Sequence, residues 1–113
     1  MSIPTWPAHQ NITPEQLKAA LDSGKEVFLL DVREAHERSV ACLKDNLHIP
    51  LGQLPTRSGE LDTNAELVIY CRTGNRSGMA ADALRQKGFT NVHNLLGGIN
   101  AWAERIDPSL SKY

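Results

Sequence analysis

The sequence predicts one α/β domain, in which a central parallel sheet is covered by helices on both faces. Continuous apolar runs of four residues occur at 27–30 and 67–70, each beside polar or charged residues. Such runs are typical of strands that are buried on both faces of a parallel sheet. Strand patterns alternate with helical patterns along the chain, which favours the α/β class. The 113 residues fit a single domain, and a second one would have no core of its own.

The first helix is expected to begin at Pro14, because proline suits the first helical position. Thr13 can cap this helix, and Gln16 completes a capping box with it. The apolar face predicted for the helix consists of Leu17, Ala20 and Leu21.

The chain between the first and second clear strands is less regular. After the strand at 27–30, residues 34–39 are charged and weakly helical. Residues 46–50 are expected to be extended or a short strand, because a residue before proline avoids the helical region. Residues 52–64 are rich in Gly, Pro, Thr and Ser, so we expect a loop with one short helical turn near Gln53.

The second half of the chain repeats the strand–helix pattern. The strand at 67–70 is followed by a helix from Arg76, a further strand at 92–95 and a last helix opening at Ile99. The face predicted for the helix after Arg76 consists of Met79, Ala80, Ala83 and Leu84. Residues 107–113 are expected to form a loose tail.

Composition excludes several classes of protein. Hydrophobic residues make up 41% of the chain and charged residues 22%, which argues against disorder and against membrane insertion. The formal net charge of −1 supplies no general field for nucleic acid or for an anionic membrane. The first ten residues lack the features of a signal peptide, so a cytoplasmic protein is expected.

The two cysteines, Cys42 and Cys71, have neither the spacing of a redox pair nor that of a zinc site. Free thiols in a reducing compartment are the simpler interpretation, with a disulfide between them as the alternative. The histidines are scattered and are interpreted as ordinary structural or surface residues. They are His9, His36, His48 and His93.

The segment with the clearest chemistry starts at Cys71, directly after a buried strand, and runs through a short loop into a helix. Ligands of open α/β sheets bind beyond the carboxyl ends of the strands. The free amides and the dipole at the start of the helix attract an anion there. Gly74 allows the loop to curl with its amides pointing inward, as in an anion-binding nest.

This setting is expected to lower the pKa of the Cys71 thiol, so that the reactive species is the thiolate. Arg72 and Arg76 lie in the same loop, and either could hold an anionic substrate through its planar guanidinium. For Thr73 and Ser77, capping of the helix is about as reasonable an interpretation as contact with the substrate. The alternative for Cys71 itself is a small buried residue without a function.

The loop Cys71-Arg72-Thr73-Gly74-Asn75-Arg76-Ser77 resembles the active-site loop of rhodanese-type sulfurtransferases. Three further motifs resemble those of the family: Leu30-Asp31-Val32-Arg33-Glu34 followed by Glu37, Asn46-Leu47-His48-Ile49-Pro50, and Leu95-Leu96-Gly97-Gly98-Ile99-Asn100-Ala101-Trp102. The similarity covers about residues 12–106, with 1–11 and 107–113 as flanking tails. One departure lies at 39–45, where the family usually shows a Gly-His-Ile-x-Gly-Ala pattern.

The resemblance implies a three-layer rhodanese-like domain and a mechanism in two half-reactions. The Cys71 thiolate would take a sulfur atom from an anionic donor such as thiosulfate and pass the persulfide sulfur to cyanide, a thiol or a protein. Arg72, Thr73, Gly74, Asn75, Arg76 and Ser77 would shape the cradle, mainly through backbone amides. The resemblance implies no metal and no organic cofactor. The oligomeric state is left open, with a monomer favoured.

Other residues of the family motifs have structural interpretations. A salt-bridge network that fixes the loop is favoured over contact with the site for Asp31, Arg33, Glu34 and Glu37. Trp102 is expected to pack in or beside the core, and Gly97-Gly98 to form a turn with positive φ. Cys42 is interpreted as non-catalytic, with a resolving thiol as the alternative.

Two other functions remain open at this point. Phosphatases and arsenate reductases of the related cell-cycle phosphatase type also place a cysteine first and an arginine last in such a loop. They have five residues between the two, whereas this chain has four between Cys71 and Arg76. A persulfide carrier in a protein sulfur relay would use the same residues as the enzyme, so the sequence does not separate these two.

Overall fold

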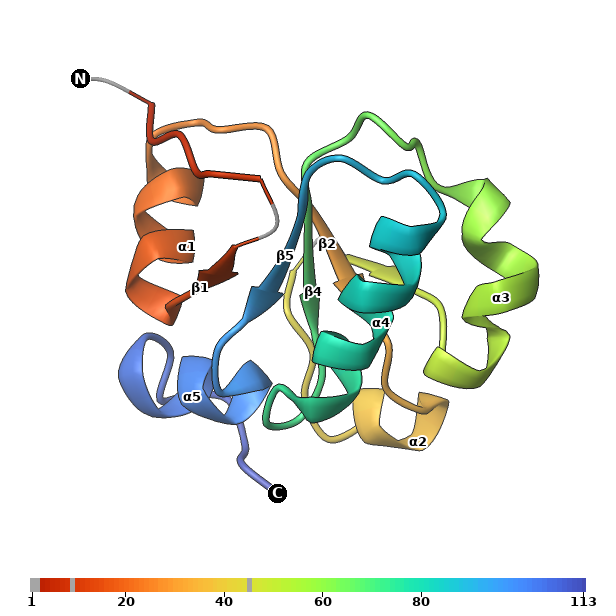
Figure 1. Ribbon diagram of the computed structural model, residues 1–113. Helices are drawn as coiled ribbons and strands as arrows, with labels where there is room; N and C mark the ends of the chain where they lie inside the picture. Colours follow the sequence, from red (N-terminus) through yellow and green to blue (C-terminus); the bar gives the residue numbers. More distant parts are fainter. Residues whose placement is uncertain (1–2, 9, 45) are drawn as a thin grey trace.

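The computed structural model describes residues 3–8, 10–44 and 46–113, and within them it shows a five-stranded parallel sheet between helices (Figure 1). The strands are β1 (Asn11–Ile12), β2 (Phe28–Asp31), β3 (Asn46–His48), β4 (Leu67–Tyr70) and β5 (Val92–Leu95). Their order across the sheet is β1-β5-β4-β2-β3, and every neighbouring pair is parallel. The predicted α/β class with a central parallel sheet is therefore confirmed.

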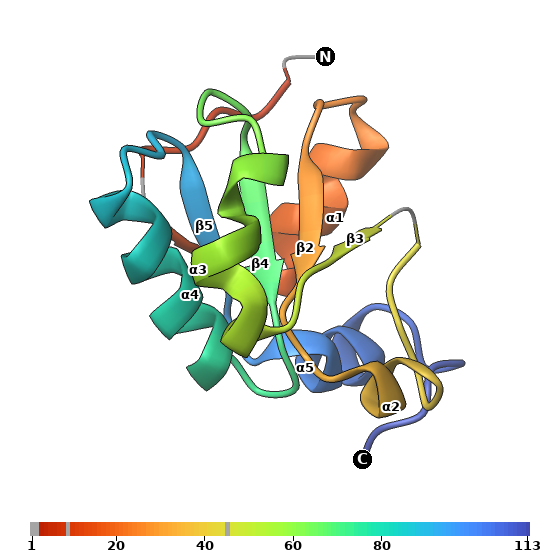
Figure 2. The same ribbon diagram turned by 90° about the vertical axis from the view of Figure 1, so that its right-hand side faces the viewer.

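Helices form a layer on each face of the sheet. They are α1 (Pro14–Asp22), α2 (Ala35–Arg38), α3 (Leu54–Arg57), α4 (Asn75–Gln86) and α5 (Gly98–Arg105). In Figure 1, α1 and α5 lie to the left of the sheet, and α3 and α4 lie to the right. Figure 2 shows that α2 and the end of the chain lie at the same end of the sheet as the loop that joins β4 to α4.

The start of α1 follows the sequence prediction. The Gln16 N–H donates to Thr13 Oγ1 over 3.1 Å, and the Thr13 N–H donates to Gln16 Oε1 over 2.8 Å, which forms the capping box. Leu17 and Ala20 are buried as expected, but Leu21 is 39% exposed, so its assignment to the buried face was wrong. Leu21 lies at the edge of this face, beside a cavity that leaves it partly open.

The buried face of α4 also differs from the prediction. Met79 is 57% exposed and Ala83 is exposed, whereas the buried residues are Ser77, Ala80, Ala81 and Leu84. These four follow the i, i+3, i+4, i+7 spacing of one helix face. The prediction considered apolar residues only, so it left out the polar Ser77, whose hydroxyl lies near the sulfur of Cys71. The predicted face was therefore rotated slightly from the one that is buried.

The segment after β3 is helical where mostly loop was predicted. Two short 3₁₀ turns, Leu51–Gln53 and Ser58–Glu60, flank α3, so residues 51–60 are helical, while residues 61–64 form the expected loop. Leu54 is buried in the core and anchors the segment. Gly, Pro and Ser are frequent in loops but also suit the ends of short helices, which is why composition misled here. Strand β1 was also missed, because its two residues are too few for a pattern.

Alternation along β4 decides on which side of the sheet the key cysteine lies. Leu67, Ile69 and Cys71 belong to the core cluster between the sheet and the α3/α4 layer. Val68 and Tyr70 belong to the opposite cluster, beside α1 and α5. Because side chains alternate between the faces of a strand, Cys71 continues the row that faces α4.

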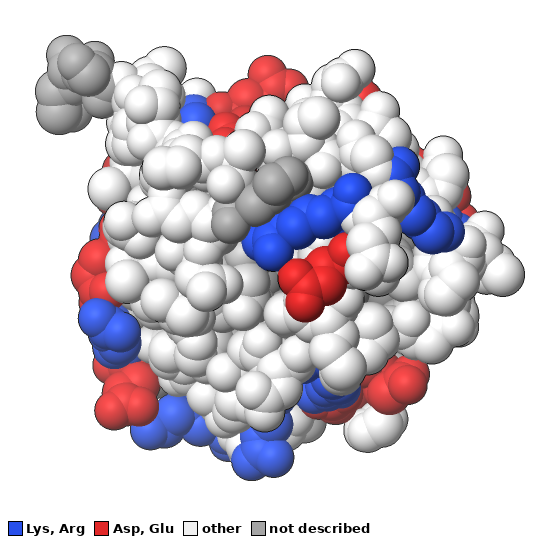
Figure 3. Space-filling model, in the orientation of Figure 1, with Lys and Arg blue, Asp and Glu red and all other residues white. Residues whose placement is uncertain are grey.

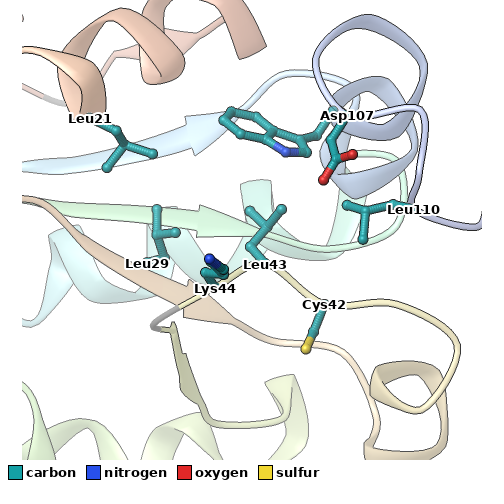
Figure 4. A pocket seen from close by; sticks show the side chains of 8 residues that line it. Leu21, Leu29, Cys42, Leu43, Lys44, Asp107 and Leu110 are labelled. Atoms are coloured by element: carbon teal, nitrogen blue, oxygen red, sulfur yellow. The ribbon is translucent and has the colours of Figure 1, made fainter.

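A cavity of about 370 Å³ lies on the opposite face, between β2, α5 and the segment at 42–44 (Figure 4). Leu29, Leu43, Trp102 and Leu110 line it, and Cys42 lies at its edge with its sulfur directed away from Leu43 and Leu110. None of the residues that line this cavity belongs to the Cys71 loop. No helix in the described part of the chain is long and apolar enough to cross a membrane.

Candidate active site

Cys71 follows the last residue of β4, and α4 starts four residues later. Its side chain is buried, with 1% of its surface exposed. The Gly74 N–H donates to Cys71 Sγ over 3.1 Å, and Ser77 Oγ lies 3.4 Å from the same sulfur. The thiol therefore lies inside the turn that leads into α4, where free amides of a helix start are available to a negative charge.

The first residues of α5 hold the loop in this shape from behind. The Ile99 N–H donates to the Cys71 carbonyl over 2.9 Å, and the Asn100 N–H donates to the Arg72 carbonyl over 3.2 Å. These two hydrogen bonds fix the backbone of the loop to α5 in a conformation in which the Gly74 N–H faces the thiol. Gly74 has φ +109°, a backbone conformation that residues with a Cβ rarely adopt. The inward-facing nest expected from the sequence is thus present.

Hydrogen bonds dominate the acidity of the thiol. Burial alone would raise the pKa of Cys71, but the Ser77 hydroxyl and the amides of Ser77, Gly74 and Thr73 hold it below its ordinary value. The direction of the pKa shift agrees with the sequence prediction. These neutral donors contribute most to the lowering of the pKa, and the positive charge of Arg76, which is coupled to Cys71, also favours the thiolate.

Asn94, which the sequence analysis did not select, supports the cradle from β5. The buried Ser77 hydroxyl donates to Asn94 Oδ1 over 2.5 Å, and Asn94 Nδ2 donates to the Gly74 carbonyl over 3.3 Å. The Ser77 hydroxyl has one proton and two neighbouring acceptors, Asn94 Oδ1 and Cys71 Sγ. The sequence signal that could have identified Asn94 is its polar side chain within the strand predicted at 92–95, whose residues are all buried.

Removal of the Ser77 hydroxyl is expected to make the thiol less acidic. In Ser77→Ala the pKa of Cys71 should rise, because the variant removes a hydroxyl that stabilises the thiolate by hydrogen bonding. The pH dependence of alkylation by iodoacetamide, in a Cys42→Ser background, measures this pKa. Ser58→Ala is the matched control, because Ser58 is buried but contacts Lys87 instead of Cys71. An unchanged pKa in Ser77→Ala would contradict the assigned role.

The second arginine of the loop is paired with a carboxylate. Arg76 donates through Nη1 and Nη2 to the two oxygens of Glu37, over 2.5 and 2.8 Å. Glu37 also accepts from the Glu34 N–H over 3.0 Å and from the Tyr113 hydroxyl over 2.7 Å. This saturation lowers the pKa of Glu37, mainly through Arg76. The pair ties α2 to α4, which is the kind of loop-fixing network that the sequence analysis favoured.

A buried ion pair lies at the end of β2, next to this network. Asp31 and Arg33 are both fully buried, and Arg33 Nη2 and Nε donate to the two Asp31 oxygens over 2.9 and 3.0 Å. Arg33 also donates to the Ala41 carbonyl over 2.7 Å and to the Tyr113 hydroxyl over 2.7 Å. These partners compensate for the burial of both charges, and the pair supports the strand ends instead of reaching Cys71.

Loss of the Glu37 charge is expected to destabilise the fold in a pH-dependent way. Glu37→Gln should lower the free energy of unfolding by about 1–2 kcal/mol at pH 7, since the variant places an amide against Arg76. The folded pKa of Glu37 is lowered, so its stabilisation is complete above the unfolded pKa of about 4.3 and is lost as the pH falls toward the folded pKa.

Urea unfolding at pH 7 and at pH 3 measures this difference. The gap between wild type and Glu37→Gln should be smaller at pH 3. Glu60→Gln is the control, because Glu60 pairs with Arg57 at the exposed surface. An equal gap at both pH values would contradict the prediction.

The remaining predicted loop residues lie toward solvent. Arg72, Thr73 and Asn75 are exposed, and Asn75 is the first residue of α4. The Arg72 guanidinium lies 4.9 Å from the centre of the Tyr113 ring. The predicted loose tail is therefore wrong at its end, where Tyr113 contacts Arg33, Glu37 and Arg72. No sequence pattern marked Tyr113, because its contacts are all distant in the chain.

The other candidates lie apart from Cys71. Cys42 is an exposed free thiol and Cys71 a buried one, so the two form no disulfide. Among the histidines, His48 contacts the Arg33 carbonyl, His93 contacts Glu66, and His9 lies outside the described residues. Trp102 packs against the core as expected. No group of His, Cys, Asp or Glu in the described ranges could hold a metal ion.

Comparison with known proteins identifies the family. A model of the rhodanese-like domain matches residues 13–105. The chain belongs to the rhodanese-like domain family. The curated relatives of this rhodanese-like domain include a sulfurtransferase from Allochromatium vinosum, 39% identical over 81% of this chain and 86% of that protein. They also include the adenylyltransferase and sulfurtransferase MOCS3 from Arabidopsis thaliana, 33% identical over 95% of this chain but only 26% of that protein.

Some relatives are thus much longer than the rhodanese-like domain described above. The chain spans about a quarter of the plant relatives and 52% of the putative sulfur carrier protein YrkF from Bacillus subtilis, which is 38% identical over 85% of this chain. Solved structures agree on the fold. A rhodanese-related protein from Thermoplasma volcanium superposes with a TM-score of 0.78 at 28% identity, covering 87% of this chain and 94% of the other. The human single-domain sulfurtransferase TSTD1 superposes with a TM-score of 0.75 at 25% identity, covering 84% and 96%.

Proposed function

We propose that this rhodanese-like domain is a sulfurtransferase that carries a sulfur atom on Cys71. The observation that carries the proposal is the thiol itself, buried at the end of β4 with the Gly74 N–H directed at its sulfur and Ser77 Oγ 3.4 Å away. The same donors that lower the pKa of Cys71 would stabilise the terminal sulfur of a persulfide. Similarity to proteins named as sulfurtransferases supports this chemistry.

The proposed reaction has two steps. The Cys71 thiolate attacks the outer sulfur of a donor such as thiosulfate, the S–S bond of the donor breaks, and sulfite leaves with the bonding electrons. An acceptor nucleophile, such as cyanide or a thiol, then attacks the outer persulfide sulfur and releases the thiolate. We propose that Arg72 and the amides of Thr73, Gly74 and Asn75 receive the anionic donor. Neither step requires a metal or an organic cofactor, because the nucleophile is the cysteine itself.

Arg76 has a different part in this proposal from the one the sequence predicted. Its guanidinium is engaged by Glu37, so we propose that Arg76 shapes the loop instead of binding the donor with both nitrogens. This pairing also argues against a phosphatase, which needs the last arginine of the loop free for the phosphate. The four-residue spacing between Cys71 and Arg76 points the same way.

A sulfur relay is the second candidate, and one observation favours it. The putative sulfur carrier protein YrkF resembles this chain over 85% of the chain's length. In a relay, a partner protein would load the persulfide and another would remove it, with the same cysteine as the carrier. Free thiols at Cys42 and Cys71 suit a reducing compartment, so for either function we propose a cytoplasmic location.

Intact-mass measurement after incubation with thiosulfate tests the proposal. Wild type should gain the mass of one sulfur atom, cyanide should remove it, and Cys71→Ser should gain none. Uptake only from a persulfide-donating protein would favour the relay. No uptake from either donor, together with hydrolysis of an aryl phosphate, would overturn both and favour the phosphatase.

A further inference from the structure

The two arginines of the Cys71 loop have different partners. Arg76 is engaged by Glu37 through two nitrogens. Arg72 is exposed and forms no ion pair with a carboxylate of any described residue. Its guanidinium lies over the ring of Tyr113, 4.9 Å from the ring centre. An aromatic face attracts a guanidinium without using the N–H donors at its edge, so Arg72 keeps these donors for an anion.

Tyr113 is itself held at both ends. Its hydroxyl accepts from Arg33 Nη1 and donates to Glu37 Oε2, each over 2.7 Å. Its carbonyl accepts from Asn100 Nδ2 over 3.2 Å, and the Asn100 N–H holds the Arg72 carbonyl over 3.2 Å. The ring is thus fixed to the same network that shapes the loop. It stands under Arg72 in a defined place, and Figure 2 shows the end of the chain beside this end of the sheet.

The face seen in Figure 3 is mostly uncharged, and its basic and acidic side chains stand in small separate groups without a broad positive patch. The net charge of −1 also supplies no general attraction for an anion. Charged groups next to the loop are therefore the local source of attraction toward Cys71. Arg72 directly follows Cys71 in the chain, and its guanidinium N–H groups form no ion pair with a carboxylate of the described residues.

We propose that Tyr113 is a positioning residue that holds the Arg72 guanidinium beside Cys71 and so makes this thiol selective for anionic reagents. An exposed arginine samples many rotamers, and the fixed ring restricts them before any reagent arrives. For the natural sulfur donor this inference rests on the proposed function. The charge selectivity itself is measured on the alkylation of Cys71 and does not require sulfur transfer.

Alkylation of Cys71 by iodoacetate and by iodoacetamide provides the test. The two reagents have similar size and the same leaving group, but only iodoacetate is negatively charged. The ratio of their second-order rate constants is independent of the thiolate fraction, so a change in the pKa of Cys71 does not affect it. All variants carry Cys42→Ser, so that only Cys71 reacts.

The expected result is a lower iodoacetate-to-iodoacetamide ratio when the ring is lost. Tyr113→Leu should lower the ratio about two- to fivefold, in line with a cation–π contact at a partly exposed site. Tyr113→Phe keeps the ring and should stay closer to wild type than Tyr113→Leu. In an Arg72→Ala background, Tyr113→Leu should have no further effect, because the ring acts through Arg72.

Two outcomes would overturn the inference. One is an unchanged ratio in Tyr113→Leu, and the other is an equal drop with and without Arg72. A parallel measurement of KM for thiosulfate separates this inference from the proposed function. If wild type takes no sulfur from thiosulfate, the proposed donor is wrong, while the alkylation ratios still decide the role of Tyr113. If wild type is active, KM should rise in Tyr113→Leu more than kcat falls.

Discussion

Cys71→Ser should lose thiosulfate-to-cyanide turnover by about 10⁴-fold or more, because it removes the atom that carries the sulfur. A serine hydroxyl is not ionised near neutral pH and does not form the persulfide. Ser77 and the Gly74 amide can still bond to the new oxygen, so the fold should stay close to that of wild type. Thiocyanate formation measures the turnover, and thermal unfolding checks the stability of the variant.

Cys42→Ser is the matched control for this loss. Cys42 is exposed and lies at the edge of a cavity to which no residue of the Cys71 loop contributes. The variant should keep wild-type turnover. This result would show that the reaction does not need Cys42 as a resolving thiol. If instead Cys71→Ser retained turnover that Cys42→Ser lacked, the sulfur would be carried by Cys42 and the assignment of the site would be wrong.

Features of the fold that depend on neighbouring residues in the chain could be predicted from the sequence. The strand at Leu67–Tyr70 is a continuous apolar run, and the capping box at Thr13 needs only four residues. The position of Cys71 at the end of a buried strand, before a glycine loop and a helix, belongs to the same class. Each of these features is encoded within a few residues, so one sequence is enough to recognise it.

Features that depend on distant contacts were missed. Asn94 supports the loop from β5, 20 residues after Gly74, and Tyr113 meets Glu37 from 76 residues away. The polar character of Asn94 within a predicted strand does not reveal its partner, and nothing in the local sequence distinguishes Tyr113 from an ordinary aromatic residue. Arg76 shows the intermediate case. Its place in the loop could be predicted, but its engagement by Glu37 depends on how α2 packs beside α4.

Gly97 and Gly98 illustrate how a local prediction can understate a role. A turn with positive φ was expected, and the structure has φ values of +74° and +62° there. Beyond that, Gly98 lies against the backbone of the loop itself. A Cβ on Gly98 would come within 2.5 Å of the Cys71 carbonyl oxygen and of the Arg72 carbonyl carbon and oxygen. This approach brings the Ile99 and Asn100 amides within reach of those two carbonyls.

Gly98→Ala should therefore destabilise the domain by at least about 3 kcal/mol and reduce turnover strongly. Its methyl group meets backbone atoms, which do not rotate away as a flexible side chain would. Relief of the contact must move α5 from the loop, break the hydrogen bonds from Ile99 and Asn100, and turn the Gly74 amide away from Cys71. Urea unfolding gives the stability, and alkylation at several pH values gives the pKa of Cys71, which should rise.

Gly88→Ala separates the two causes of this effect. Gly88 has φ +94°, but no atom lies within 4 Å of the place that a Cβ would occupy, so its alanine variant meets the backbone strain without the contact. It should cost about 1 kcal/mol and leave the pKa of Cys71 unchanged. A Gly98→Ala variant that is no less stable than Gly88→Ala, and that keeps an acidic thiol, would show that the loop does not need the close approach of α5. Lower stability together with a raised pKa would show that α5 holds the amides of the loop toward the sulfur.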